Sequence, residues 1–144
     1  MKVVADTGPL VAAVNVRDEA HALAAALVTE LGRDLIVLEP VVVEVDHLLR
    51  GRVGSGAARL FLDALVAGEH GVAFLTSALL RRAVELDARY ADLDLGVADA
   101  SIMAYAERHR LPILTFDFEH FRATAPARGQ WRLVVDEARY RDST

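Results

Sequence analysis

Short apolar runs alternate along the chain with longer runs that have helical spacing. Runs rich in Val, Ile and Leu predict buried strands, and apolar residues three and four positions apart predict helices. The expected strands are the run that begins at Lys2 and stops at Asp6, then Asp34–Glu39, Gly71–Thr76, Leu111–Asp117 and, at a sheet edge, Trp131–Asp136. The expected helices are Leu10–Val14, Asp18–Leu31, Val41–Arg50, Ala57–Ala67, Ser77–Tyr90 and Gly96–His109, with a loop over Phe118–Gln130.

The alternation of strands with helices predicts an α/β fold. Right-handed crossovers place such strands in a parallel sheet that helices cover on both faces. With 144 residues, of which 53% are hydrophobic, the chain fits one domain, 1–144, with a sizeable core. Residues 137–144 are polar, and we expect them to form a frayed tail.

Composition removes several classes of function. The chain has no Cys, which excludes disulfides and thiolate metal sites and suits a cytoplasmic location. It shows neither a signal-peptide pattern nor an apolar run long enough to cross a membrane. Lys2 is the single lysine, so P-loop and Schiff-base chemistry are excluded. The net charge of −5 argues against binding of nucleic acid through a general basic surface.

Four acidic residues stand out against the apolar pattern. Asp6 and Asp117 end predicted strands, and Glu44 and Asp99 lie within the apolar stripes of predicted helices. A carboxylate in such a position is costly unless it is paired or binds a cation. Other interpretations stay open, because Asp6 is also a suitable N-cap and the helix that carries Glu44 can turn that residue toward water.

All four carboxylates can converge at one edge of the sheet, since the carboxyl ends of parallel strands and the adjoining loops meet there. Two carboxylates about 4 Å apart repel by about 4 kcal/mol at an effective dielectric of about 20, so such a cluster takes up protons or cations. Oxygen ligands favour Mg²⁺ or Mn²⁺ over zinc. A hard cation held by few carboxylates keeps bound water and can activate it for attack on a phosphodiester.

Four motifs, in their order and spacing, resemble those of PIN-domain ribonucleases. They are Asp6-Thr-Gly-Pro-Leu, Glu44 within Val-Val-Glu-Val-Asp-His-Leu-Leu, Gly96-Val-Ala-Asp-Ala-Ser-Ile, and Thr115-Phe-Asp117 followed by Phe121. The size and the single-domain layout are similar to those of the VapC toxins of bacterial and archaeal toxin–antitoxin pairs. Gly8 departs from the pattern, because many members have Ser or another small residue there.

The resemblance implies a three-layer α/β/α sandwich with a central, mainly parallel sheet, and metal-dependent endoribonuclease activity on RNA. It implies catalytic roles for Asp6, Glu44, Asp99 and Asp117. Among these, Asp6 and Asp99 would be the ligands of Mg²⁺, for which Mn²⁺ would substitute. It also implies a homodimer and a VapB-like antitoxin as partner. Alternatives from other classes stay open: a metal-dependent phosphatase, a DNA 5′-nuclease, or a non-catalytic binding module.

Two surfaces are expected to serve these partners. Small apolar residues over Ala22–Leu27 and Ala57–Leu65, taken with the resemblance, predict an apolar groove beside the active pocket that accepts an amphipathic antitoxin helix. Because the chain is acidic overall, contacts to RNA phosphates are expected from arginines around the acidic pocket. The candidates by position are Arg50, Arg52 and Arg122.

Overall fold

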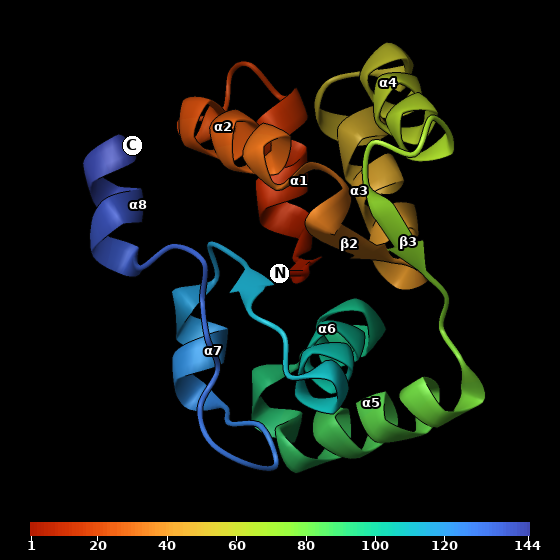
Figure 1. Ribbon diagram of the computed structural model, residues 1–144, viewed down its shortest axis with the longest axis vertical. Helices are drawn as coiled ribbons and strands as arrows, with labels where there is room; N and C mark the ends of the chain where they lie inside the picture. The colour runs from red at the N-terminus through yellow and green to blue at the C-terminus, as the bar shows by residue number, and fades with distance from the viewer.

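The computed structural model describes all residues, 1–144, and contains one four-stranded sheet (Figure 1). The strands are β1 (Val3–Ala5), β2 (Leu35–Leu38), β3 (Gly71–Ala73) and β4 (Ile113–Leu114), in the spatial order β3-β2-β1-β4. Every neighbouring pair is parallel. The expected parallel sheet is therefore confirmed, and it places β1 beside β4 although the two strands come from opposite ends of the chain.

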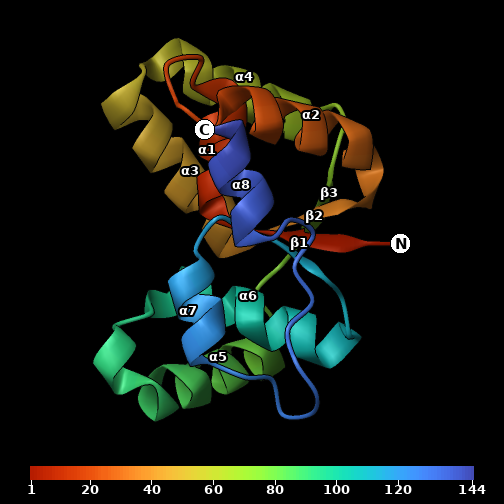
Figure 2. The same ribbon diagram turned by 90° about the vertical axis from the view of Figure 1, so that its left-hand side faces the viewer.

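Helices cover both faces of this sheet. Figures 1 and 2 show α1 to α4 on one side and α5 to α7 on the other, which gives the three-layer α/β/α arrangement. The helices are α1 (Thr7–Val14), α2 (His21–Leu31), α3 (Glu39–Arg52), α4 (Ser55–Val66), α5 (Ser77–Arg89), α6 (Gly96–His109), α7 (Phe118–Ala123) and α8 (Glu137–Ser143). Short 3-10 turns, Gly32–Asp34 and Ala91–Leu93, precede β2 and α6. None of these helices combines the length and the hydropathy that crossing a membrane requires.

The core is built from the strands and the inward faces of the helices. Every residue of β1, β2 and β4 is buried, as expected for strands that are covered on both sides. Helix α3 buries one stripe, Val41, Val45 and Leu49, and each such side chain contributes about 1.5–3 kcal/mol on full burial. Gly71 begins the edge strand β3, and a Cβ atom there would lie 2.7 Å from Cδ1 of Ile36 on β2, so a larger residue would require the end of that side chain to shift. The buried sheet positions the loops that follow its strands.

Three segments near the carboxyl end differ from the predictions made from the sequence. They are Trp131–Asp136, Phe118–Gln130 and residues 137–144. The predicted edge strand makes only a single parallel bridge, between Ile113 and Leu133. The chain then leaves the sheet, because the Asp136 side chain accepts a hydrogen bond from the Arg139 N–H and begins α8.

The predicted loop after Asp117 begins with a helix, α7, and the predicted frayed tail forms α8. The Asp117 side chain caps α7 by accepting a hydrogen bond from the His120 N–H at 3.1 Å. The Tyr140 ring of α8 packs against the rings of Phe116 and Phe118, with 4.7 and 5.6 Å between ring centroids. Both helices are too short to show an apolar period, so a cap and a tertiary aromatic contact order them instead.

Candidate active site

Asp6 lies at the carboxyl end of β1 and is buried. Its backbone N–H donates to the Leu114 carbonyl of β4 at 2.8 Å, which holds the carboxyl ends of the two strands side by side. One carboxylate oxygen, Oδ1, accepts from the Thr7 N–H at 2.7 Å and so caps α1. The other, Oδ2, accepts from the Thr115 hydroxyl at 2.6 Å. Both interpretations of Asp6 therefore hold, because it caps a helix and also lines a pocket.

Thr115 connects Asp6 with the acidic residue that follows β4. Its side chain is fully buried, donates to Asp6 and accepts from the Asp117 N–H at 2.9 Å. The Asp117 side chain is 41% exposed, so its carboxylate is open to solvent and to ligands. Thr115 thereby ties the buried carboxylate of Asp6 to the backbone of Asp117, whose own carboxylate is accessible.

Glu44 on α3 and Asp99 on α6 reach the same place from the helices. Both residues are half-buried. Together with Asp6 and Asp117 they line one pocket of about 640 Å³ at the carboxyl edge of the sheet. The structure thus brings together all four acidic residues that stood out in the sequence.

Carboxylates gathered in this way repel one another, and burial adds to the cost of charging them. Burial is the main cause that raises the pKa of Asp99 from 3.8 to about 7. The neighbouring charges of Asp6 and Glu44 also raise the pKa of Asp99, whereas His120 lowers it. Burial likewise raises the pKa of Asp6, although its two hydrogen bonds act in the opposite direction. A cation in the pocket would relieve this repulsion.

His120 contacts two of the acidic residues and was not predicted from the sequence. Its Nδ1 lies 2.8 Å from Oδ2 of Asp117 and 3.7 Å from Oδ2 of Asp99. The available signal was the spacing of three residues between Asp117 and His120, which places both on one side of a helical turn. This spacing brings two side chains together only in a helix, and the segment Phe118–Gln130 was predicted to be a loop.

Residues of α3 and α8 complete the wall of the pocket: Arg52, Glu137, Tyr140 and Arg141. Of the three arginines predicted to contact RNA, Arg52 lines the pocket. Arg50 instead pairs with Asp46, with 3.0 Å between Nε and Oδ1, and Arg122 pairs with Glu137. Arg52 is therefore the one of these three arginines that lines the pocket and has no carboxylate partner.

The donor atoms of the pocket fit a hard divalent cation. They include carboxylate oxygens, and the buried Thr7 hydroxyl at its wall has no hydrogen-bond partner. No three His, Asp or Glu side chains converge closely enough to enclose an ion by themselves. Mg²⁺ does not need such a cage, because it is held by one or two carboxylates and keeps several waters. Asp6 and Asp99, the two carboxyl groups with raised pKa values, fit this need, since each oxygen accepts more than one bond.

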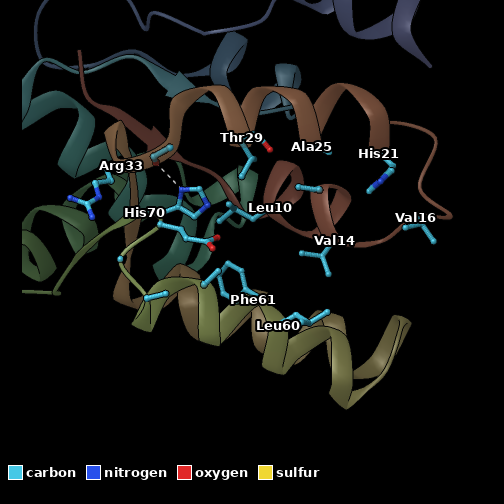
Figure 3. A pocket seen from close by; sticks show the side chains of 17 residues that line it. Leu10, Val14, Val16, His21, Ala25, Thr29, Arg33, Leu60, Phe61 and His70 are labelled. Atoms are coloured by element: carbon cyan, nitrogen blue, oxygen red, sulfur yellow. Dashed lines mark hydrogen bonds between the residues drawn. The ribbon is translucent and has the colours of Figure 1, made fainter.

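A second, mainly apolar groove lies between α1, α2 and α4 (Figure 3). Its volume is about 820 Å³, and its lining includes Ala25 from α2 and Leu60 and Phe61 from α4. Figure 3 shows His21 and His70 toward its opposite ends, and each Nδ1 lies 2.8 Å from a backbone carbonyl oxygen. The groove lies between the two apolar segments from which an antitoxin groove was predicted, but it shares no lining residue with the carboxylate pocket.

The chain is similar to known proteins over most of its length. Residues 3–126 match the PIN domain family, and this range includes all four acidic residues of the pocket. The chain is 33% identical over 125 residues to Ribonuclease VapC26 of Mycobacterium tuberculosis (strain ATCC 25618 / H37Rv). This alignment covers 86% of the chain and 93% of that protein.

Three solved structures share the fold. The Mycobacterium tuberculosis VapC20, a toxin that cleaves the sarcin–ricin loop, matches with a TM-score of 0.77 and 22% identity over 85% of this chain and 95% of that one. VapBC2 from Rickettsia felis matches with a TM-score of 0.62 and 15% identity, over 85% and 92% of the two chains. A toxin–antitoxin complex from Klebsiella pneumoniae matches with a TM-score of 0.64 and 19% identity, over 92% and 100%. Given the match over residues 3–126 and the relative at 33% identity, the chain belongs to the PIN-domain family, among the VapC-type ribonucleases.

Proposed function

We propose that the carboxylate pocket is the catalytic centre of a metal-dependent endoribonuclease and that the chain is the toxin of a toxin–antitoxin pair. The observation that carries this proposal is the gathering of four acidic side chains on one pocket, where the pKa of Asp99 is raised to about 7. Carboxylates that lie close together repel one another when all are ionised, so they are suited to bind a cation and, with it, an anionic phosphate. An acidic chain can thereby hold a polyanion at one place.

In this proposal Asp6 and Asp99 hold the cation, Mg²⁺ with Mn²⁺ as a substitute. When bound, such an ion stabilises charge on the phosphate and lowers the pKa of a bound water. Asp6 is prepared for this role by the hydrogen bonds from Thr7 and Thr115, which fix the orientation of its carboxylate. Asp99 lies in the first turn of α6, and this position places its carboxylate at the pocket. Two ligands that repel each other gain most from a shared cation.

The other side chains of the pocket orient the substrate. Glu44 and Asp117 accept hydrogen bonds from water and so hold it near the scissile phosphate. The Asp117 carboxylate is itself held by His120, whose Nδ1 lies 2.8 Å from Oδ2. Arg52 lines the pocket and binds a phosphate oxygen, a contact for which a guanidinium is well suited.

The apolar groove between α1, α2 and α4 is the proposed antitoxin site. The structures that share this fold include VapBC2 from Rickettsia felis and a toxin–antitoxin complex from Klebsiella pneumoniae, which supports an antitoxin as the partner of this chain. Leu60 in the groove is 69% exposed, which suits the apolar face of an amphipathic helix. A VapB-like antitoxin seated there would inhibit the toxin. Action in the cytoplasm as a homodimer stays a prediction.

Cleavage assays with RNA and DNA test the proposal. The purified protein is incubated with an end-labelled RNA and a DNA of the same sequence, in MgCl₂, MnCl₂ or EDTA. We expect internal cuts in the RNA that require the divalent metal. Asp99→Asn should lower the rate at least about 100-fold, because the cation stabilises the transition state by several kcal/mol. Asp63→Asn, on the exposed side of α4, is the matched control and should cleave like the wild type.

The same assay separates the alternatives. Metal-dependent hydrolysis of a simple phosphate monoester, with RNA left intact, would support a phosphatase. Cleavage of DNA alone would support a 5′-nuclease. A protein that binds Mn²⁺ and hydrolyses none of these substrates would contradict the proposal in favour of a binding module.

A further inference from the structure

Four arginines surround a polar cleft at the opposite end of α6 from the carboxylate pocket. This arginine patch consists of Arg108 and Arg110 at the carboxyl end of α6, and of Arg128 and Arg132 in the segment after α7. The cleft has a volume of about 610 Å³. Figure 2 shows the segment after α7 returning past the carboxyl end of α6. All four residues are exposed.

The arginine patch has no acidic partners. None of its guanidinium groups lies within 4.0 Å of a carboxylate, unlike several arginines elsewhere: Arg50, Arg82, Arg122 and Arg141. The one acidic residue of the cleft, Glu107, accepts hydrogen bonds from Nε and Nη2 of Arg82 at 2.8 and 2.9 Å. These bonds lower the pKa of Glu107 and balance its charge. The patch thus concentrates uncompensated positive charge on a chain whose net charge is −5.

Hydrogen bonds hold the two halves of the patch together. The Ala127 N–H donates to Oε1 of Glu107 at 2.7 Å, which ties the loop to α6. Nη2 of Arg132 donates to the Arg110 carbonyl at 2.5 Å, which joins the two halves directly. These two bonds fix the backbone segments that carry the arginines and the guanidinium of Arg132 before a ligand arrives, and this lowers the entropic cost of binding.

We propose that the arginine patch is a second RNA-binding site, which holds the phosphodiester backbone outside the segment that is cleaved. This inference rests on the proposed ribonuclease function. Guanidinium groups bind phosphate oxygens in pairs and stack on aromatic rings, so a cleft lined by arginines suits a nucleic acid strand. Because the chain is negative overall, binding of RNA away from the carboxylate pocket is favoured at the arginine patch, where the local charge is positive.

The separation of the two sites sets the length of RNA that can use both. From Asp99 to Arg110, α6 advances about 16 Å at about 1.5 Å per residue. A helical strand carries one phosphate per about 3.4 Å of its axis, so about five nucleotides separate the sites. A tetranucleotide whose central phosphate lies at the carboxylate pocket extends about two nucleotides to each side and does not reach the arginine patch, whereas an RNA of about 20 nucleotides can.

A triple variant, R108Q/R110N/R128Q, removes most of the patch charge. Asn is chosen at 110 because Arg110 has φ +52°, a conformation that Asn tolerates well. Arg132 is kept because its guanidinium bonds to the backbone of Arg110. Circular dichroism and the melting temperature verify that the variant is folded.

The matched control, R17Q/R59Q/R81Q, removes the same charge from exposed arginines outside both clefts. Affinity for a labelled 20-nucleotide RNA is measured by fluorescence anisotropy in EDTA, from 50 to 200 mM KCl. Cleavage of a tetranucleotide is measured separately in MgCl₂. Binding therefore reports on the patch, and cleavage of the short RNA reports on the proposed function.

Loss of three phosphate contacts should lower the salt slope of the triple variant by about two. The wild-type affinity should then fall roughly 15-fold more than that of the variant between 50 and 200 mM salt. The control should match the wild type, and all three proteins should cleave the tetranucleotide alike. Equal salt slopes in the triple variant and the control would overturn the proposal. So would unchanged RNA affinity together with lost binding of poly-glutamate, which would assign the patch to an acidic protein. A wild type that binds the long RNA through the patch but cleaves none would refute the ribonuclease function alone.

Discussion

Asp99→Asn is expected to stabilise the metal-free protein at neutral and alkaline pH. In the folded state, burial and then the neighbouring carboxylates raise the pKa of Asp99 from 3.8 to about 7. Between these two pH values the folded state holds a proton that the unfolded state has lost, so stability falls as the pH rises through this window. The destabilisation is absent below pH 3.8 and complete above about pH 7. Asn carries no charge, so the Asp99→Asn variant does not have this destabilisation.

The magnitude follows from the size of the shift. A shift from 3.8 to about 7 corresponds to at most about 4 kcal/mol, at about 1.36 kcal/mol per pKa unit. The Asp99 side chain is 30% exposed, and solvent screening reduces this to about 2 kcal/mol. Loss of the attraction between the carboxylate and the N-terminus of α6 removes about 0.5 kcal/mol. A net gain of about 1–2 kcal/mol should raise the Tm by about 2–8 °C for a chain of 144 residues.

Thermal unfolding in EDTA, followed by circular dichroism from pH 5 to 8.5, measures the effect. The difference in Tm between Asp99→Asn and the wild type should grow with pH and level off above about pH 7. Asp63→Asn, an exposed acid on α4, should show no such growth. A lower Tm of Asp99→Asn at pH 8, or a difference that is the same at every pH, would refute the reasoning.

Binding of Mn²⁺ should strengthen as the pH rises through about 7, because the proton on Asp99 must leave before its carboxylate becomes a ligand. Calorimetric titration in buffers of different ionisation enthalpy would detect the released proton, and pH-independent affinity would contradict the assignment. Thr115→Val should lower the free energy of unfolding by about 1–3 kcal/mol, because Oδ2 of Asp6 and the Asp117 N–H lose their partner. Urea unfolding measures this, and Thr115→Ser, which keeps the hydroxyl, should stay close to the wild type. Ala25→Arg in the apolar groove should abolish growth rescue by the co-expressed antitoxin while RNA cleavage continues, because an unpaired guanidinium would face the apolar helix. Rescue that persists would place the antitoxin elsewhere.

The sequence was enough to identify the four acidic residues of the pocket, because each of them interrupts or ends a locally periodic apolar pattern. They are Asp6, Glu44, Asp99 and Asp117. The periods of strands and helices reflect burial of neighbouring residues, so a charge inside them stands out before the chain is folded. The alternation of the same patterns implied the parallel sheet and its layers. The order of the motifs was enough to indicate the family that residues 3–126 then matched.

Only the tertiary structure decided what surrounds these acids. Pairing of β1 with β4 brings Thr115 to Asp6, the capped helix α7 brings His120 to Asp117, and packing of aromatic rings places Tyr140 at the pocket. The arginine patch likewise joins the end of α6 to a loop that lies beyond β4 and α7. None of these contacts leaves a periodic signal, because they join distant segments or order helices of one or two turns. Their free energy is gained only once the chain has closed around them.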